Sequence, residues 1–412
     1  MHTLLLKVAI SGGLLGGLVG VGVGLERAEP ESPFAVAGKA ARQGPAGSLN
    51  YLLPQQELRR LRSTYLGASA SPEQVGTYWQ ALATYASLAD EADTAAYCWQ
   101  RLAGPASTVK KANEAPEVLL PAGPAILAQT KGRQVVMFNE EHTQPRGRWL
   151  LGSLLPALYR QGFRYLAMEA LEPADSAGLR QRGYPVAGSG FYTNEPHFGN
   201  LIRQARRLGF RLVAYESLAP DREQGQARNL LAATLGPHPR ARVLVLAGHG
   251  HINEAGPLSM AQWVRQLAGI DPLTIEQTQA ALASPARWQQ LPAGAYVVPR
   301  ARMPNLFITS DLYVLNRLAP TAGNGFGDPL AQRVVLTVPA DSLPPGQAQQ
   351  LLVYWQAERV RPDAEPVAVR CLWPGQSSAG LALLPGTYAA ELRTAAGQRR
   401  WHKLLEIKKK AK

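Results

Sequence analysis

The chain has 412 residues, enough for two or three domains, and its 46% hydrophobic and 18% charged residues exclude an intrinsically disordered protein. The formal net charge of +13 comes mainly from arginines scattered along expected helices, with further lysines in the terminal segment 408–412. Basic and aromatic residues are not interleaved as in single-strand binders, so we expect a small-molecule substrate and no nucleic acid.

The first 27 residues combine Lys7, an apolar and glycine-rich stretch from Val8 to Leu25, and then Glu26 and Arg27. This pattern indicates an export signal or an uncleaved membrane anchor. We therefore expect an exported protein, either periplasmic or attached to the membrane through this segment and facing the periplasm. Residues 28–50 are rich in Pro, Ala, Gly and Ser and indicate a linker.

Residues 51–113 carry apolar side chains at helical spacing, with a helix start at Ser71-Pro72-Glu73, and predict a helical segment packed on the core. The two cysteines, Cys98 and Cys371, are too few for a disulfide framework. A single bridge between them is an unfavoured alternative, because they lie in segments expected to belong to different domains.

Strands and helices alternate over residues 114–318, which predicts an α/β domain with a mostly parallel sheet and flanking helices. The expected strands cover residues 134–138, 165–168, 211–215, 243–247, 273–275 and 295–298. The expected helices cover residues 149–160, 198–208, 222–235 and 258–267.

The last part of the chain changes to short alternating runs between Pro and Gly turns. Runs at 334–338, 351–355, 367–370 and 386–392 predict a small all-β sandwich over residues 332–412, ending in a basic tail. The Pro- and Gly-rich residues 319–331 indicate a linker in front of it.

Several expected strands of the α/β domain are followed directly by ionisable residues. Because the carboxyl ends of parallel strands meet at one edge of a sheet, these side chains are expected to converge there. Charges gathered at such an edge are costly unless they pair, bind metal or transfer protons, so we expect a functional site. The residues are Glu140 with His142, Glu169, Glu216, and His249 with His251.

This set allows more than one function. A Glu and a His in hydrogen-bond reach can activate water for hydrolysis, the carboxylate fixing the tautomer of the imidazole. Alternatively, two or three imidazoles with a carboxylate can hold a divalent metal or haem without turnover, and the ligands would be His142, His249, His251 and Glu140. The spacing does not decide, and an inactive scaffold is a third alternative.

Four short motifs in residues 114–257 resemble the superfamily of erythromycin esterases and ChaN-like haem-binding lipoproteins, with TraB/Tiki proteins as remote members. Asn139-Glu140-Glu141-His142 resembles its Gly-Glu-x-His signature, which also occurs as Gly-Glu-x-x-His, with Asn for Gly, and Met168-Glu169 resembles its second strand end. The segment from Arg222 to Asn229 resembles its Arg-Asp-x-x-Met-Ala-x-Asn helix start. Gly248-His249-Gly250-His251 resembles its Gly-Asn-x-His motif, with His249 in the Asn position.

The resemblance implies roles for these residues. His142 would be the general base or a metal ligand, oriented by Glu140 and Glu169. Arg222 and His251 would contact substrate or stabilise developing negative charge, and we expect Glu216 beside them. The expected activity is hydrolysis of an ester-like or amide-like bond.

A loop over residues 189–199 leads into an expected helix and can close the site. Tyr192 and His197 are candidates for lining a substrate pocket, although His197 can equally pack on the helix that Glu195 caps. Arg146, like Arg148, is placed to clamp an anionic group or to remain solvated. No nucleophile elbow and no phosphate-binding loop is present, which disfavours a serine hydrolase and nucleotide chemistry.

Overall fold

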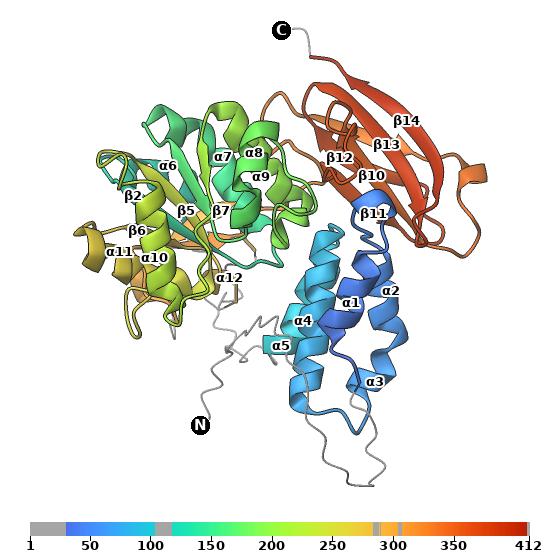
Figure 1. The fold of residues 1–412 in the computed structure, drawn as a ribbon, viewed down its shortest axis with the longest axis horizontal. Helices are drawn as coiled ribbons and strands as arrows, with labels where there is room; N and C mark the ends of the chain where they lie inside the picture. Colours follow the sequence, from blue (N-terminus) through green and yellow to red (C-terminus); the bar gives the residue numbers. More distant parts are fainter. Residues whose placement is uncertain (1–29, 104–117, 283–287, 289, 304–306, 410–412) are drawn as a thin grey trace. The chain divides into compact units, whose positions relative to one another are not determined.

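The computed structural model describes residues 30–103, 118–282, 288, 290–303 and 307–409 (Figure 1). The expected export signal over residues 1–27 lies outside the described residues, as do the last three residues of the basic tail. Within the described part of the chain, no helix is both long and apolar enough to cross a membrane.

An eight-stranded sheet forms the centre of the α/β domain, in the order β1-β7-β8-β6-β2-β5-β3-β4. The neighbours in the run from β8 to β4 pair in parallel, whereas β7 pairs antiparallel with both β8 and β1, which confirms the mostly parallel sheet. The strands are β1 (Leu120–Pro121), β2 (Val135–Glu140), β3 (Tyr165–Met168), β4 (Arg211–Val213), β5 (Val243–Gly248), β6 (Leu273–Glu276), β7 (Ala295–Val298) and β8 (Leu312–Asn316). We did not expect β8, although its apolar Leu312–Leu315 run is typical of a strand.

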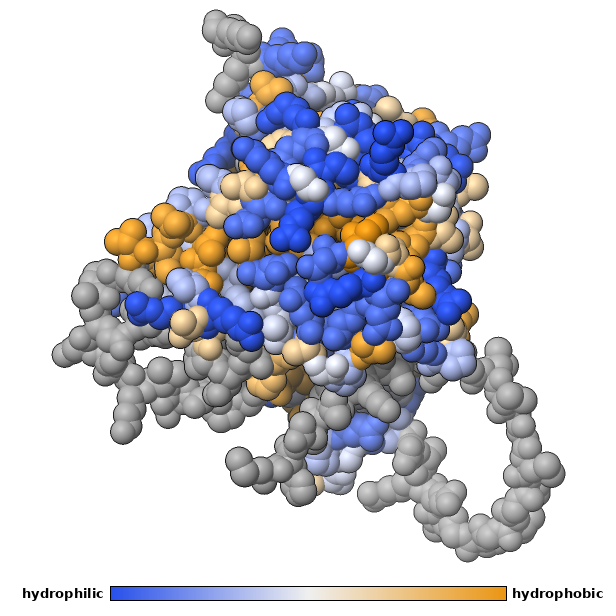
Figure 2. Space-filling model, turned by 90° about the vertical axis from the view of Figure 1, so that its left-hand side faces the viewer, coloured by the Kyte–Doolittle hydropathy of each residue, from blue (hydrophilic) through white to orange (hydrophobic). Residues whose placement is uncertain are grey.

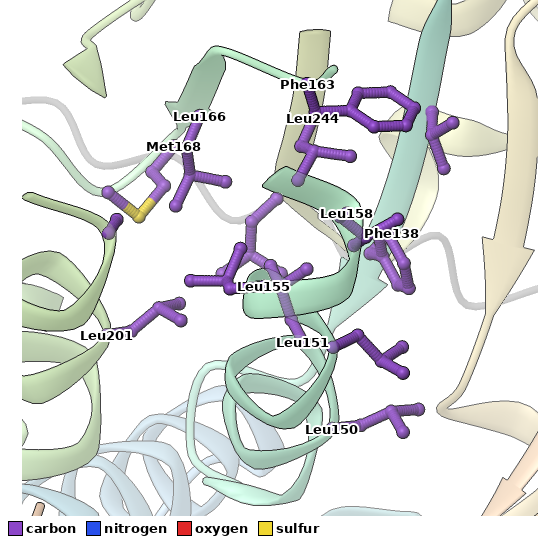
Figure 3. Close-up of a cluster of buried hydrophobic side chains, with 14 of the residues drawn as sticks. Phe138, Leu150, Leu151, Leu155, Leu158, Phe163, Leu166, Met168, Leu201 and Leu244 are labelled. Carbon is purple, nitrogen blue, oxygen red and sulfur yellow. The ribbon is translucent and has the colours of Figure 1, made fainter. Parts of the chain in front are cut away.

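Helices cover both faces of this sheet. Successive side chains of β2 point to opposite faces, so each face contributes its own apolar residues to the packing. Val136 and Phe138 pack with leucines of α7 and α9, whereas Val135 and Met137 pack with α10 and α11. Figure 3 shows Phe138 beside the leucines of α7. The helices are α6 (Ala122–Gln129), α7 (Arg146–Arg160), α8 (Ser176–Arg182), α9 (Pro196–Leu208), α10 (Arg222–Ala233), α11 (Met260–Ala268) and α12 (Gln279–Leu282).

The C-terminal part is an antiparallel β-sandwich, as expected. A four-stranded sheet in the order β11-β10-β13-β14 faces the pair β12-β9 across a shared apolar core. Its strands are β9 (Gln332–Thr337), β10 (Gln349–Trp355), β11 (Ala368–Leu372), β12 (Ser378–Leu383), β13 (Gly386–Thr394) and β14 (Arg399–Ile407). The structure adds β12 and β14 to the expected strands. β14 is an edge strand of which only Leu405 is buried, so its sequence shows little apolar alternation.

The N-terminal helical segment shares an apolar core with this β-sandwich, and it also contacts the α/β domain on which we expect it to pack, where Tyr85 meets Phe191 and Asp90 meets His197. Leu352 and Tyr354 of β10 and Val369 of β11 share an apolar cluster with the helices. The run in β10 is buried on both faces of the sheet, which explains its lack of polar alternation. Cys98 and Cys371 lie in the same cluster as free thiols. The helices are α1 (Pro33–Ala41), α2 (Leu53–Arg60), α3 (Arg62–Leu66), α4 (Pro72–Leu88) and α5 (Ala92–Ala103).

Helix α1 stands where a linker was expected over residues 28–50. Pro33 occupies its first turn, where a missing N–H costs nothing, and its alanines favour a helix. Ala37, Ala40 and Ala41 are buried. The alanine content that indicated a linker is therefore the buried face of a helix.

The face shown in Figure 2 is mainly hydrophilic, with a band of hydrophobic residues across it. The large exposed hydrophobic side chains come from separate segments, among them Leu218, Phe307 and Val335. Single exposed hydrophobic residues of this kind are normal in folded proteins.

Candidate active site

The carboxyl ends of β2, β3 and β5 lie side by side, because β5 pairs with both β2 and β3. Glu140 at the end of β2 is the register partner of Gly248 at the end of β5. After β5 the chain continues on the other side of β2 as β6, so these strand ends lie where the strand order reverses. Such positions are where α/β sheets bind ligands.

The first half of the site is centred on the Glu140 carboxylate, which is 1% exposed. His142 Nδ1 lies 2.9 Å from Glu140 Oε1. Arg148 Nε donates to Glu140 Oε2 at 2.9 Å, and its Nη2 donates to the His142 carbonyl at 2.6 Å. Glu140 therefore holds the imidazole while a buried arginine neutralises the carboxylate.

Arg148 connects the site to the loop in front of α9. Its Nη1 donates to Glu195 Oε2 at 2.8 Å, and Glu195 caps α9 by accepting from the amides of His197 and Phe198. Burial disfavours the charged guanidinium, but Glu140 and Glu195 outweigh this and raise the pKa of Arg148. Arg148 is thus a charged residue inside the core, not the solvated or anion-clamping arginine we considered.

The second half of the site is centred on Glu169, just after β3. Its Oε2 accepts from the Gly248 amide at 2.6 Å, and its Oε1 lies 3.1 Å from His251 Nε2. His251 Nδ1 lies 2.9 Å from Glu223 Oε2, so both nitrogens of this imidazole face carboxylates. Burial lowers the pKa of His251, but Glu169 and Glu223 outweigh it and raise this pKa to about 10. Burial raises the pKa of Glu169, but the positive charges of His251 and Arg222 outweigh it and hold this pKa well below 4.5.

Because the pKa of His251 is higher in the folded protein, its contribution to stability is fully present below its ordinary pKa of 6.5 and is lost as pH rises through about 10. We expect His251→Gln to lower the free energy of unfolding by about 3 kcal/mol at pH 6 and by much less at pH 10. Urea unfolding of both proteins at pH 6, 8 and 10 measures this difference. A loss that does not shrink with pH would contradict a charged His251.

Arg222 joins Glu169 to Glu216. Its Nη2 donates to Glu169 Oε1 at 2.7 Å and to Glu216 Oε2 at 2.6 Å, and its Nη1 lies 3.4 Å from His251 Nε2. The Arg222 side chain is 45% exposed, whereas that of His251 is 9% exposed. Of the two cations implied to meet substrate, Arg222 is the accessible one. His251 instead holds Glu169 in place.

The two halves face each other across a short gap. His142 Nε2 lies 3.9 Å from Glu169 Oε2, too far for a direct hydrogen bond but suited to a shared water or hydroxyl group. A Cβ atom at Gly248 would lie 3.1 Å from both His142 Nε2 and Glu169 Oε2. The missing side chain of Gly248 therefore lets the backbone approach both groups.

Tyr192 lies on the His142 ring, with centroids 4.2 Å apart and an interplanar angle of 20°. Phe191 makes edge contacts with Tyr192 and with Tyr85 of α4. Phe191 is 45% exposed, so an aromatic wall with an accessible edge borders the imidazole. Tyr192 is a predicted pocket residue, whereas no pattern in the sequence assigns Phe191 or Tyr85 to the site.

The predicted metal ligands do not meet at one point. His249 pairs with Glu141, and its Nδ1 lies 3.1 Å from Thr278 Oγ1, while His142 and His251 are engaged by other carboxylates. In the described ranges, no group of three or more His, Cys, Asp or Glu side chains is arranged to hold a metal ion. The four-ligand arrangement of His142, His249, His251 and Glu140 is therefore not formed.

Two predicted pocket residues lie apart from this gap. His197 is fully buried, and its Nε2 lies 3.3 Å from Asp90 Oδ1. His197 therefore packs on the helix that Glu195 caps, which is the second alternative for this residue. Arg146 is exposed at the start of α7, where its carbonyl accepts from Asn316.

Glu195 and Glu223 also belong to the network, although neither is among the predicted site residues. The structural role of Arg148 is likewise not predicted. One signal was available for Arg148, which is spaced from Leu151 and Leu155 so as to share their buried helix face. A charge on an apolar face requires a buried partner. Glu223 stands at the Asp position of the helix-start motif quoted for Arg222 to Asn229, and Glu195 is a helix-cap candidate, but neither pattern shows which residue would pair with it.

No family model matches the chain, and no curated protein is significantly similar to it. Among solved structures, the type III effector HopBA1 matches at 13% identity, covering 52% of this chain and 100% of the other, with a TM-score of 0.34. RRSP, a MARTX toxin effector domain from Vibrio vulnificus, matches at 14% identity over 60% of this chain and 62% of the other, with a TM-score of 0.30. Part of Pasteurella multocida toxin, described with a thiol-protease-like catalytic triad, matches at 11% identity over 60% of this chain and 38% of the other, with a TM-score of 0.28. Likenesses this low show nothing about the function of this chain.

Proposed function

We propose that the protein is a hydrolase in which His142 takes a proton from a water molecule that attacks an ester-like or amide-like bond of a small molecule. The observation that carries this proposal is the 2.9 Å contact of His142 Nδ1 with the buried Glu140 carboxylate. A carboxylate in this position keeps the proton on Nδ1 and leaves Nε2 as the base. Nε2 faces the gap to Glu169, where a water can be held.

The other side chains support this step. Glu140 stabilises the imidazolium that forms, and Arg148 keeps the carboxylate fixed. The imidazolium then gives its proton to the leaving alcohol or amine as the ester or amide bond breaks, which returns His142 to its neutral form. Glu169 accepts a hydrogen bond from the attacking water, and its ionised state is maintained by His251 and Arg222. Arg222, as the accessible cation, can contact the negative charge that develops on the substrate.

The test uses chromogenic esters and anilides, with and without a chelator, on the wild-type protein and on His142→Ala. We expect this substitution to lower kcat/KM by about 10⁴-fold or more while the protein stays folded, because it removes the base. His238→Ala is the matched control, since His238 is exposed and bonds Arg211 at the amino end of β4. Equal turnover by His142→Ala would overturn the proposal.

The same preparation tests the alternative of a metal- or haem-binding protein. Stoichiometric metal or haem that depends on His142 and His251, together with no turnover of any substrate, would favour binding over hydrolysis. We expect neither chelator nor haem titration to change the turnover.

A further inference from the structure

The loop that carries Tyr192 is held by the C-terminal β-sandwich. The connection between β10 and β11, residues 356–367, runs along this loop, residues 183–195. Val186 and Ala364 form an isolated antiparallel bridge, and the Ala187 amide donates to the Asp363 carbonyl at 2.9 Å. Two segments far apart in the sequence are thus joined through their backbones.

Helix α9, which follows the loop, is held by the same connection. Arg203 of α9 donates to Glu358 at 2.7 Å and to the Glu365 carbonyl at 2.6 Å. Asn200 donates to the Val367 carbonyl at 2.8 Å. These donors are buried, so the contacts are shielded from competing water.

Glu365 brings this connection next to the site. Its side chain is buried, and its Oε1 lies 3.1 Å from the Thr193 hydroxyl, one residue after Tyr192. A Cβ atom at Gly199 would lie 2.7 Å from Glu365 Oε2, so a glycine in α9 makes room for the carboxyl group. The Thr193 hydroxyl also lies 2.8 Å from the Gly190 carbonyl, within the same loop.

The number of hydrogen-bond donors at the contact between Thr193 and Glu365 favours a neutral Glu365 carboxyl group. Thr193 has one hydroxyl hydrogen, which the Gly190 carbonyl can accept, and a protonated Glu365 can then donate to the Thr193 oxygen. Burial raises the pKa of Glu365 well above 4.5, which agrees with this arrangement. Glutamine has the same shape and can donate in the same place.

We propose that Glu365 is a positioning residue for His142, through which the C-terminal β-sandwich keeps Tyr192 stacked on the imidazole. It does not touch the reacting atoms. Its effect passes through Thr193 to Tyr192, whose ring lies 4.2 Å from that of His142. The catalytic role of His142 rests on the proposed function, whereas its contact with Tyr192 can be measured without turnover.

The experiment records histidine ring resonances by NMR in the full-length protein, with His142 assigned by its loss in His142→Ala. Tyr192→Leu removes the ring current of Tyr192, so it gives the full change in the chemical shift of His142 that loss of the stacking can produce. We expect Glu365→Ala and Thr193→Val to move the His142 signal in the direction of Tyr192→Leu, and Glu365→Gln to leave it near the wild-type position. On a substrate of the wild type, Glu365→Ala should lower kcat by up to about 10²-fold, with rescue by Glu365→Gln.

Tyr388→Phe is the control for general loss of stability. It removes hydrogen bonds with Asn324 and Leu384 inside the β-sandwich and does not touch the loop. An unmoved His142 signal in Glu365→Ala and Thr193→Val, or an equal movement in Tyr388→Phe, would overturn the positioning role. If the shifts follow the expectation but no substrate is turned over, the proposed hydrolysis fails and the positioning role stands.

Discussion

Replacing Arg148 with methionine is expected to lower the free energy of unfolding by about 3–5 kcal/mol, the largest loss of stability that we foresee at the site. The substitution keeps most of the buried volume but leaves Glu140 and Glu195, each 1% exposed, without their cation. Removing one partner of a buried ion pair costs more than the pair contributes, because the remaining charge cannot be solvated. Guanidinium unfolding followed by circular dichroism measures the loss.

Arg265→Met is the matched control for Arg148→Met. Arg265 also pairs with a carboxylate, Asp271, but both side chains are more than half exposed. We expect this control to change stability by less than about 1 kcal/mol. A similarly small change in Arg148→Met would show that the two glutamates do not depend on this cation.

Replacing Glu140 with glutamine is expected to lower kcat/KM by about 10³- to 10⁴-fold, the largest loss of activity that we foresee short of removing His142. The glutamine amide can donate a hydrogen bond to Nδ1, which a carboxylate cannot. The imidazole then carries its proton on Nε2, the atom that faces the gap to Glu169, and has no lone pair there for the water. The reaction is followed on the best chromogenic substrate, and the tautomer by the ¹⁵N shifts of the His142 ring.

Glu141→Gln is the matched control for Glu140→Gln, since Glu141 is the adjacent carboxylate and pairs with His249 instead. We expect it to retain turnover within about 10-fold of the wild type, because the tautomer of His142 is unchanged. Comparable losses in the two variants would show that the charge of the region, and not the tautomer of His142, controls the activity.

The α/β sheet could be predicted closely because its strands are short apolar runs without alternation. The expected strand at 165–168 has the observed bounds of β3, and the expected start of β5 at Val243 is the observed one. Elements governed by distant partners could not be predicted in the same way. The alanines of α1 are buried against other elements of the fold, and the charged β14 is a strand because β13 provides its hydrogen bonds.

The candidate site shows the same division. The residues that end a strand or begin a helix could be predicted, and Glu140, His142, Glu169, Glu216, Arg222 and His251 do lie in adjoining networks. The pairing of these residues with one another could not be predicted, because spacing along the chain does not show that His251 contacts Glu223 or that His249 contacts Glu141. The β10–β11 connection reaches the catalytic loop from a different part of the sequence, and no local pattern marks it.

The shared core of the N-terminal helices and the β-sandwich has a consequence for the order of folding. Asn50 Oδ1 accepts from Gln350 Nε2, a contact between residues 300 positions apart. The helices are among the first described elements to be synthesised, yet the apolar side chains with which they face the β-sandwich are covered only after β10 and β11 have left the ribosome. Such long-range closure slows folding and leaves apolar surface exposed in the meantime. The α/β domain can complete its own core during this interval, so the nascent chain is expected to need protection at its first helices rather than at its sheet.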